Sequence, residues 1–314
     1  MKNVVIIVLI LLVISLGVGG YIFMNSAGQG VFNGSMQMVT NEDTSLKIGR
    51  DQAMGRGFDV DGFEASHTLE TVNISSSLDS HQIPGILIRS TQETGVVILV
   101  HGMSGNRVSV YPEAEMFLRN GYHVLAYDQR SSGENTAPYT TYGVWESKDL
   151  LDYIRYVEDA FPEGTPIILW GTSFGGATVG IALGDPSIQD KVEAAILDSP
   201  ISSMEDMIAA KTEEMGIPFP TNLLMKAGSF YTNRELGFTF QDGEVAQYTA
   251  TTTIPTLVMN SQVDTVTPYY MGEEIYHSLT VEKKELFTVP DSKHGDLYND
   301  YPEEYENTIM NFLL

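Results

Sequence analysis

Short apolar runs alternate with segments of helical periodicity along most of this chain, and that alternation constrains the fold more than any other feature. Most of the runs lack polar alternation, which is typical of parallel strands buried on both faces. They are Val96–Val100, Tyr122–Tyr127, Ile167–Trp170, Ala194–Leu197, Thr256–Asn260 and Glu285–Val289. Between two of them, Leu150, Ile154, Val157 and Phe161 recur at the spacing of one helix face. We therefore expect an α/β fold whose mostly parallel sheet has helices on both faces.

Two further extended segments, Thr68–Ile74 and Ile83–Ile88, precede the first run. They predict an antiparallel hairpin and bring the expected sheet to eight strands. Helices are expected over Val108–Arg119, Tyr142–Phe161 and Tyr301–Leu314. Residues 199–253 are too long for a simple crossover and are rich in Met and aromatic residues. We expect them to form a small helical lid, inserted in a domain of residues 58–314 and lying over the carboxyl edge of the sheet.

Residues 1–24 are expected to form a transmembrane anchor. Val4 to Met24 contain no charged residue, and at about 1.5 Å rise per residue they give about 30 Å, the thickness of a bilayer core. Lys2 precedes this run and the next basic residue is Lys47, so the positive-inside rule predicts an extracytoplasmic catalytic domain. A cleaved signal peptide, which would leave a secreted protein, is the alternative. Residues 25–57, rich in Gly, Asn, Ser and Gln, are expected to be a linker.

The chain is strongly acidic, with 41 acidic and 17 basic residues and a formal net charge of −24. Such a surface repels phosphates, so we expect no nucleic-acid partner. The sequence has no cysteine, which excludes a thiol nucleophile and cysteine-ligated zinc, and no histidine pair has metal-ligand spacing. We expect neither a metal nor a cofactor.

The pentapeptide Gly171-Thr172-Ser173-Phe174-Gly175 follows an apolar run directly and precedes a stretch of small residues. A chain that turns this sharply from strand to helix strains the central residue. Side chains two positions before and after it would meet neighbouring backbone, which glycine avoids. The Ser173 hydroxyl then projects into open space, so this pattern predicts Ser173 as a nucleophile.

A serine nucleophile requires a base within hydrogen-bond reach. The chain contains six histidines, and His294 is the one that directly follows the last predicted strand. A loop at that point can carry the imidazole to Ser173. We therefore expect His294 to be the base.

The base in turn requires a group that orients it. Asp264 follows the penultimate predicted strand and Asp198 ends the strand before that, and both lie where active groups gather in parallel sheets. We prefer Asp264 as the orienting acid and expect Asp198 to bond backbone at the root of the lid. Asp291 and Asp296 are less favoured because they lie so close to His294 in the sequence.

Acyl transfer places negative charge on a carbonyl oxygen, which two backbone N–H groups can stabilise. Phe174, at the expected start of a helix, supplies one, and the helix dipole there also favours an anion. Met103, in the His-Gly-Met loop after the first of the six runs, is expected to supply the other. We interpret His101 as a residue that holds this loop, and Asp128 and Arg130 as residues that fix a turn.

Six motifs together resemble, in order and spacing, those of the α/β-hydrolase superfamily over about residues 63–314. They are HGMSGN, YDQRSSGEN, WGTSFGG, LDSP, SQVDTVTP and SKHGD. The chain looks most like bacterial membrane-anchored members with a short lid, and is similar to prolyl-oligopeptidase-type and monoacylglycerol-lipase-type hydrolases. The resemblance implies Ser173 as nucleophile, His294 as base, Asp264 as orienter, and Met103 with Phe174 as oxyanion donors. Many relatives of this kind have Arg-Gly-His-Gly where this chain has Arg-Ser-Ser-Gly at 130–133. This departure puts in question the contacts that the loop makes in such relatives, and it leaves the triad unaffected.

We therefore expect a serine hydrolase that cleaves carboxylic ester or thioester bonds of a small-molecule substrate through an acyl-enzyme. A peptidase or amidase would use the same triad, with acidic lid residues to bind a peptide amino terminus. The candidates for that role are Glu205, Asp206, Glu213 and Glu214. A membrane-tethered binding protein on a hydrolase scaffold is the remaining alternative. The resemblance implies an aspartate at this position in dehalogenases and epoxide hydrolases of the superfamily. Serine at position 173 therefore argues against both of these activities.

Overall fold

The computed structural model describes residues 2–314, except for the side chains of residues 2–14 and 16. The chain divides into two compact units. The helical unit comprises Met1–Met38 and Met204–Asp242, and the sheet unit comprises Val39–Ser203 and Gly243–Leu314. The residues of the predicted catalytic site all belong to the sheet unit.

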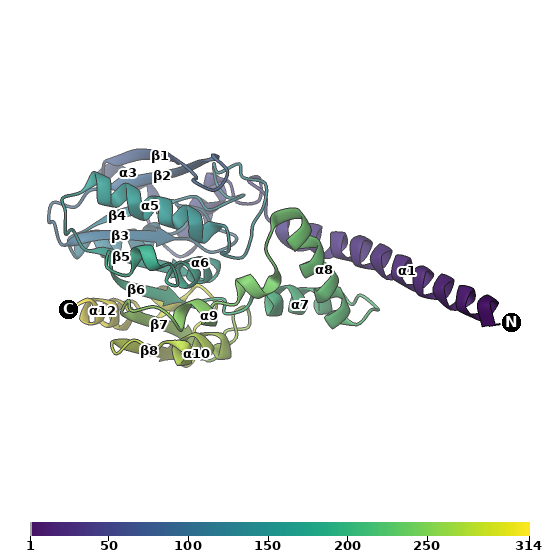
Figure 1. The fold of residues 1–314 in the computed structure, drawn as a ribbon. Coiled ribbons are helices and arrows are strands. Elements are labelled where there is room, and N and C mark those ends of the chain that lie inside the picture. The colour runs from purple at the N-terminus through teal and green to yellow at the C-terminus, as the bar shows by residue number, and fades with distance from the viewer. Residues whose placement is uncertain (1) are drawn as a thin grey trace. The chain divides into compact units, whose positions relative to one another are not determined.

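Eight strands, counted over residues 2–314, form one mixed sheet in the sheet unit (Figure 1). They are β1 (Leu69–Ser75), β2 (Gln82–Ile88), β3 (Gly95–Val100), β4 (Tyr122–Tyr127), β5 (Ile167–Thr172), β6 (Val192–Asp198), β7 (Thr256–Ser261) and β8 (Lys284–Val289). Their order is β1-β2-β4-β3-β5-β6-β7-β8, with β2 antiparallel to both neighbours and the other pairs parallel. The predicted eight-stranded, mostly parallel sheet with an antiparallel hairpin is confirmed.

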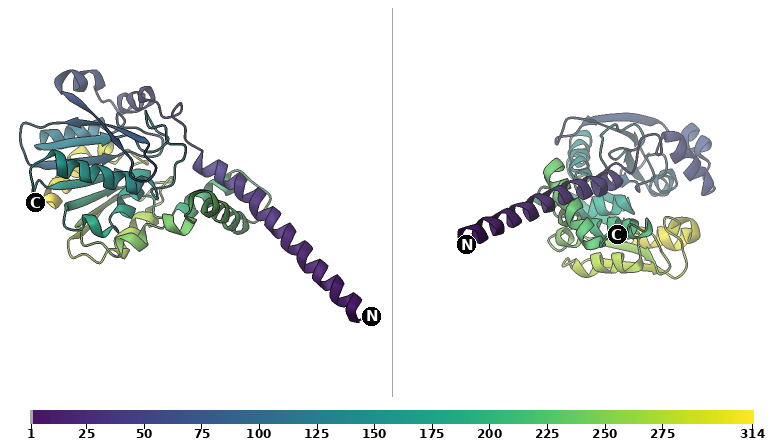
Figure 2. Two further views of the ribbon diagram at one scale, coloured as in Figure 1. Left: turned by 45° about the horizontal axis from the view of Figure 1, so that its top comes forward. Right: turned by 90° about the vertical axis from the view of Figure 1, so that its right-hand side faces the viewer.

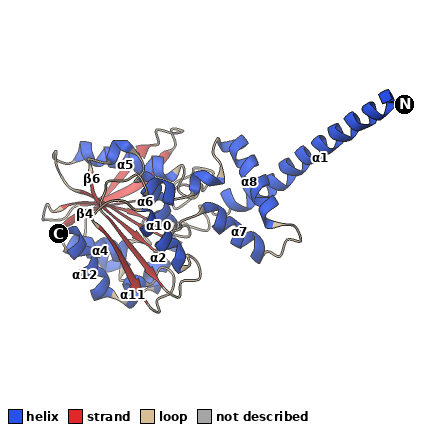
Figure 3. Cartoon of the chain, turned by 60° about the horizontal axis from the view of Figure 1, so that its bottom comes forward, coloured by secondary structure: helices blue, strands red, loops and turns tan. Residues whose placement is uncertain are grey.

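Helices cover both faces of this sheet, as expected (Figure 3). On one face α2 (Leu46–Gly55), α3 (Val60–Ser66), α4 (Tyr111–Arg119) and α12 (Pro302–Leu313) contribute to a single apolar cluster. Alternate strand residues enter that cluster, such as Val97 and Leu99 of β3, because successive side chains point to opposite faces. Helices α5 (Glu146–Ala160), α6 (Phe174–Ala182) and α10 (Tyr269–Ser278) pack on the other face. The remaining helical pieces are η1 (Pro186–Ile188), α9 (Ala246–Thr249) and α11 (Leu297–Asp300).

Two helices begin later than the sequence predicts, for local reasons. The segment predicted to be helical from Tyr142 becomes α5 only at Glu146, because Tyr142 and Gly143 have φ of 53° and 95°. The helix predicted from Val108 becomes α4 at Tyr111, because the preceding residues form a turn around the Asn106 side chain, which accepts the Val108 N–H. Helix α10 was not predicted.

The prediction of a linker over residues 25–57 is wrong. Residues 25–36 belong to α1 (Lys2–Met36), and residues 46–55 form α2. Ala53 is fully buried in the core of the sheet unit, and the Asn106 amide donates to the carbonyls of Thr44 and Ser45 at 2.9 Å. Residues 39–57 are therefore part of the folded domain, because their small and polar side chains find partners far along the chain.

The helical unit contains α1, α7 (Met204–Glu214) and α8 (Thr221–Leu236), and the short η2 (Phe240–Gly243) follows them. Helix α1 packs along α8 (Figure 2). Gly28 of α1 and Gly228 of α8 allow this approach, since a Cβ on either would lie closer than 3.0 Å to the other helix. The Phe32 and Tyr231 rings add a contact at 5.4 Å.

The predicted insertion of residues 199–253 is helical, but its two ends belong to the sheet unit. Ser203 and Glu244 form an antiparallel bridge there, and the Ser203 hydroxyl donates to the Glu244 carboxylate at 2.7 Å. The position of the insertion over the carboxyl edge of the sheet stays a prediction.

The predicted anchor of residues 1–24 falls partly on residues whose side chains lie outside the described part of the chain. Among the residues that are described, no helix is both long and apolar enough to cross a membrane. The structure thus gives the anchor no support.

Candidate active site

Ser173 occupies a strained turn between β5 and α6. Its φ of 55° and ψ of −117° are rare for a residue with a side chain. Two backbone hydrogen bonds hold this conformation: the Ser173 N–H donates to Asp198 O at 2.8 Å, and the Ile201 N–H donates to Ser173 O at 3.2 Å. The turn directs the Ser173 side chain away from the sheet, as the sequence predicts.

The glycines on either side of Ser173 are required by close backbone contacts. A Cβ on Gly171 would lie closer than 3.0 Å to Gly175 O, and a Cβ on Gly175 would lie closer than 3.0 Å to Val100 O. Both obstacles are backbone atoms, which cannot swing aside as a side chain can. The predicted steric reason for the Gly-x-Ser-x-Gly spacing is confirmed.

Ser173, His294 and Asp264 form a continuous chain of hydrogen bonds. His294 Nε2 lies 2.9 Å from Ser173 Oγ, and His294 Nδ1 lies 2.7 Å from Asp264 Oδ2. A carboxylate only accepts, so Nδ1 carries the imidazole proton and Nε2 is left to accept the Ser173 hydroxyl proton. The structure therefore brings together the three residues that the sequence analysis selected, from the loops after β5, β7 and β8.

The environment of Asp264 keeps it ionised. Burial alone would raise the pKa of this carboxyl, but the hydrogen bond and charge of His294 and two backbone N–H groups together lower the pKa below its ordinary value. Those N–H groups belong to Val266 and Thr267, which donate to Oδ1 at 2.8 and 3.0 Å. An ionised Asp264 can hold the Nδ1–H tautomer of His294 and stabilise the imidazolium that forms when Ser173 loses its proton.

The backbone segments that carry the two expected oxyanion donors both adjoin Ser173. Phe174 is the first residue of α6, where backbone N–H groups have no partner within the helix. The loop that carries Met103 also reaches the nucleophile, because a Cβ on Gly102 would lie 3.5 Å from Ser173 Cβ. The structure thus places both backbone segments beside the serine.

His101 holds the Met103 loop, and its imidazole ring is in a single, neutral state. Its Nδ1–H donates to Gly102 O at 2.7 Å, and its Nε2 accepts the Gln129 N–H at 2.9 Å. Burial lowers the pKa of His101 to about 4, so the ring stays uncharged near neutral pH. The Gln129 side chain completes the link by donating to His101 O at 2.6 Å and accepting from the Thr178 hydroxyl of α6 at 2.8 Å. The predicted loop-holding role agrees with these contacts.

Asp198 is fully buried, and its contacts differ from those expected. The sequence analysis expected it to bond backbone, but its side chain accepts the hydroxyls of Ser199 at 2.9 Å and Tyr305 at 2.8 Å. Tyr305 in turn accepts the Trp170 indole N–H at 2.9 Å. Burial raises the pKa of Asp198 to about 6. This carboxyl lies behind the nucleophile, and it is Asp264 that contacts His294.

Asp128 and Arg130 fix the turn after β4, as expected. Asp128 pairs with the Arg107 guanidinium and accepts the N–H groups of Arg107 and Glu134 at 2.9 Å each. Arg130 is fully buried and pairs with Asp149 at 2.8 Å. In this turn Ser131 adopts a φ of 57°, which is rare for a residue with a side chain.

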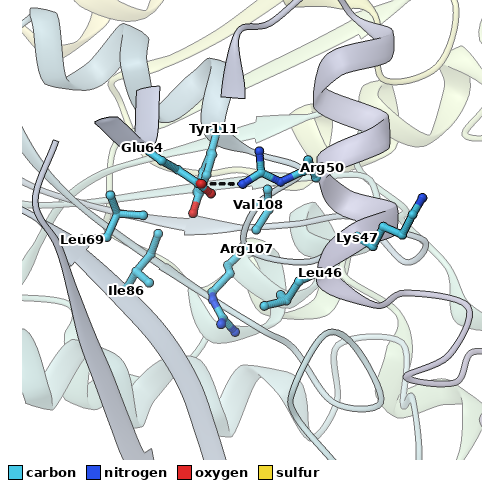
Figure 4. Close-up of a pocket in the computed structure, with 9 residues that line it drawn as sticks. All are labelled: Leu46, Lys47, Arg50, Glu64, Leu69, Ile86, Arg107, Val108 and Tyr111. Atoms are coloured by element: carbon cyan, nitrogen blue, oxygen red, sulfur yellow. Dashed lines mark hydrogen bonds and ion pairs between the residues drawn. The ribbon is translucent and has the colours of Figure 1, made fainter. Parts of the chain in front are cut away.

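A pocket of about 460 Å³ opens among apolar side chains of α2, β1 and β2 and the charged groups of Arg50, Glu64 and Arg107 (Figure 4). Both of its arginines already pair with carboxylates of the chain, Arg50 with Glu64 and Arg107 with Asp128. Within the described residues, no group of three or more His, Cys, Asp or Glu side chains could hold a metal ion.

Residues 95–220 match the family described as alpha/beta hydrolase fold, and the strand order and the turn at Ser173 agree with that match. The chain has the α/β-hydrolase fold. It is 23% identical, over 258 residues, to the uncharacterized protein YqkD of Bacillus subtilis (strain 168), covering 82% of this chain and 83% of that protein.

Solved structures show the same fold. The Pyrococcus furiosus esterase Pf2001 matches with a TM-score of 0.65 and 24% identity, covering 82% of this chain and 95% of that one. The Paleococcus ferrophilus monoacylglycerol lipase matches with a TM-score of 0.53 and 19% identity, covering 74% and 98%. At these identities the likeness establishes the α/β-hydrolase fold and leaves the substrate open.

Two residues of the site, Thr267 and Tyr305, were not among those expected from the sequence. Thr267 contacts both Asp264 and His294, and Tyr305 bonds to Asp198 across the chain. Tyr305 could not be found from local pattern, because its partners lie more than 100 residues away. Thr267 had a weak local signal, since a threonine three residues after an aspartate often caps the same turn.

Proposed function

We propose that this protein is a serine hydrolase that cleaves carboxylic ester or thioester bonds through an acyl-enzyme. The observation that carries the proposal is the hydrogen-bonded chain from Ser173 Oγ through His294 to Asp264. The fold and its esterase and lipase neighbours support a hydrolase. The ester or thioester specificity is our proposal.

The reaction would proceed in two halves. His294 Nε2 takes the Ser173 proton as Oγ attacks the acyl carbon, and the carbonyl oxygen becomes an anion between the Met103 and Phe174 N–H groups. The tetrahedral intermediate collapses, the bond to the alcohol or thiol breaks, and that leaving group takes the proton from His294. A water molecule then gives His294 a proton and attacks the acyl carbon. The second tetrahedral intermediate collapses, Ser173 Oγ takes the proton from His294, and the carboxylic acid is released. Asp264 stays ionised throughout and stabilises the imidazolium.

Hydrolysis and covalent labelling test the proposal directly. We expect the full chain to hydrolyse p-nitrophenyl esters of short acids and to react with a fluorophosphonate probe. Ser173→Ala should lower kcat by about 10⁴ to 10⁶ and abolish labelling. Ser187→Ala, an exposed serine in η1, is the matched control and should behave like wild type. An unlabelled wild-type protein, or full labelling of Ser173→Ala, would refute the proposal.

A matched set of an ester, a thioester and an amide with one acyl group tests the bond specificity. We expect ester and thioester to be cleaved and the amide to be cleaved at least about 10²-fold more slowly, because an amine leaves less readily than an alkoxide or a thiolate. Amide cleavage at a rate equal to that of the ester would indicate the peptidase alternative instead.

The proposed location is the outer side of a membrane, with residues 4–24 as the anchor. This part rests on the sequence alone, namely the uncharged run and the single preceding Lys2. We expect the full chain to resist alkaline extraction from membranes, and a variant without residues 1–24 to be released. A mature N-terminus near Ala27 would instead indicate a cleaved signal peptide and a secreted protein.

A further inference from the structure

The Thr267 hydroxyl lies at the centre of the candidate site. Thr267 is 3% exposed and follows Asp264 by three residues in the loop after β7. Its Oγ1 lies 3.0 Å from Asp264 Oδ2, 3.1 Å from His294 Nδ1 and 3.0 Å from Ser199 O. A threonine buried only for packing has no need of three polar neighbours around one oxygen atom.

Counting protons assigns a role to each contact. His294 Nδ1 carries a proton, because the Asp264 carboxylate can only accept, so Thr267 Oγ1 is an acceptor toward the ring. The hydroxyl's own proton can be donated to Asp264 Oδ2 or to Ser199 O, which lie at equal distance. In both arrangements the Nδ1–H faces two acceptors, Asp264 Oδ2 and Thr267 Oγ1, and their positions define the plane of the imidazole.

The contact with Ser199 links the base to the nucleophile. Ser199 directly follows β6 and has a φ of 47°, and its N–H donates to Met259 O at 2.7 Å. The residues on either side of Ser199 and Pro200 hold Ser173, since Asp198 O accepts the Ser173 N–H and the Ile201 N–H donates to Ser173 O. The Thr267 hydroxyl thus connects the segment after β6, which holds the turn of the nucleophile, with the loop of the acid and the loop of the base.

We propose that Thr267 is a positioning residue that fixes the imidazole plane and the Nδ1–H tautomer of His294 relative to Ser173. The inference rests on the proposed function for its effect on rate, but the placement of the His294 proton can be measured without a substrate. Thr267 acts through His294 and does not itself exchange a proton with the substrate. A loss of positioning lowers kcat and leaves substrate binding nearly unchanged.

Three variants of the full chain separate positioning from packing. Thr267→Val keeps the branched shape and removes the hydroxyl, whereas Thr267→Ser keeps the hydroxyl and removes a methyl group. Thr256→Val is the matched control, because Thr256 is also fully buried but its hydroxyl donates to Ile254 O at 2.9 Å, at the start of β7. We expect Thr267→Val to lower kcat for a p-nitrophenyl ester about 10- to 100-fold with KM changed by less than about threefold. Thr267→Ser and Thr256→Val should stay within about fivefold of wild type.

Proton NMR of the ¹⁵N-histidine-labelled chain provides the readout that does not need a substrate. The His294 Nδ1–H signal, assigned by its loss in His294→Gln, should shift and exchange faster with water in Thr267→Val and be retained in Thr267→Ser. The buried His101 Nδ1–H, which donates to Gly102 O, is an internal control and should be unchanged. An unaltered His294 signal in a folded Thr267→Val protein, or a Thr267→Ser protein as impaired as Thr267→Val, would overturn the inference. An altered His294 signal in a chain whose wild type neither hydrolyses esters nor reacts with fluorophosphonate would support the positioning role and refute the proposed function.

Discussion

Replacing Asp198 by asparagine is expected to stabilise the sheet unit, and the gain in stability should be larger at neutral pH than at acid pH. Asp198 is buried behind the nucleophile, and in the described part of the chain it forms no ion pair. Its partners are the uncharged hydroxyls of Ser199 and Tyr305. An ionised carboxylate in such a place has lost its hydration without a direct ion pair to replace it, although the charge of His294 lowers its pKa in part.

The size of the effect follows from the pKa of Asp198. Burial is the main cause that raises this pKa from 3.8 to about 6, and the charge of Glu113 adds to it, while the Tyr305 and Ser199 hydroxyls oppose it. A raised carboxyl pKa means that the folded state binds the proton more tightly, so stability falls as pH rises from 3.8 to 6. Two pKa units correspond to about 3 kcal/mol. The ionised Asp198 therefore destabilises the fold by about 1 kcal/mol at pH 4.5 and by about 3 kcal/mol at pH 7.5.

Urea unfolding of wild type and Asp198→Asn at these two pH values measures the difference. Tryptophan fluorescence reports on the correct unit, because the chain's two tryptophans, Trp145 and Trp170, both lie in the sheet unit, and Trp170 bonds to Tyr305. The free energy of unfolding of Asp198→Asn, relative to wild type, should increase by about 2 kcal/mol from pH 4.5 to pH 7.5. Asp190→Asn, at an exposed site, controls for the loss of one charge. The reasoning is wrong if the difference between wild type and Asp198→Asn is the same at both pH values or becomes smaller at pH 7.5.

Two further substitutions test the geometry of the site. Gly175→Ala places a Cβ closer than 3.0 Å to Val100 O. We therefore expect fluorophosphonate labelling to fall at least about tenfold and the melting temperature to drop. A variant that is labelled like wild type would contradict the need for this close backbone contact. Asp264→Asn should favour the wrong tautomer of His294 and lower kcat by about 10⁴ with little change in KM, measured with the same ester. If Asp264→Asn kept full activity while Asp198→Asn lost it, the orienting acid would be Asp198.

Strands β3 to β7 could be predicted closely because they are mostly buried apolar runs whose ends are marked by turn residues. Tyr122–Tyr127 agrees at both ends with β4, and the other five runs differ from their strands by at most two residues at either end. The errors fall where a boundary depends on backbone conformation or on distant partners. The late start of α5 follows from positive φ at two residues, and the contribution of residues 39–57 to the sheet unit follows from contacts with a loop about 60 residues away.

The candidate triad was predictable for a different reason. Parallel strands end at one edge of the sheet, so residues that follow β5, β7 and β8 must lie near one another whatever their separation in the sequence. That topological argument identifies the loops but not the contacts within them. It therefore led to Ser173, Asp264 and His294. It left Thr267 and Tyr305 unrecognised, because the sequence does not show which hydroxyl of a loop or of helix α12 contacts residues far along the chain.

The backbone strain at the site is shared between two consecutive strand ends. Ser173 follows β5 with φ of 55°, and Ser199 follows β6 with φ of 47°, although neither is glycine. Each conformation depends on the other, since Asp198 O, just before Ser199, accepts the Ser173 N–H, and the Ile201 N–H, just after it, donates to Ser173 O. Strain of this kind persists only where the surroundings hold it, and here the Thr267 hydroxyl is one of the groups within hydrogen-bond distance of Ser199 O. The Gly-x-Ser-x-Gly motif is therefore half of the strained unit, and the segment from Asp198 to Ile201 is the other half.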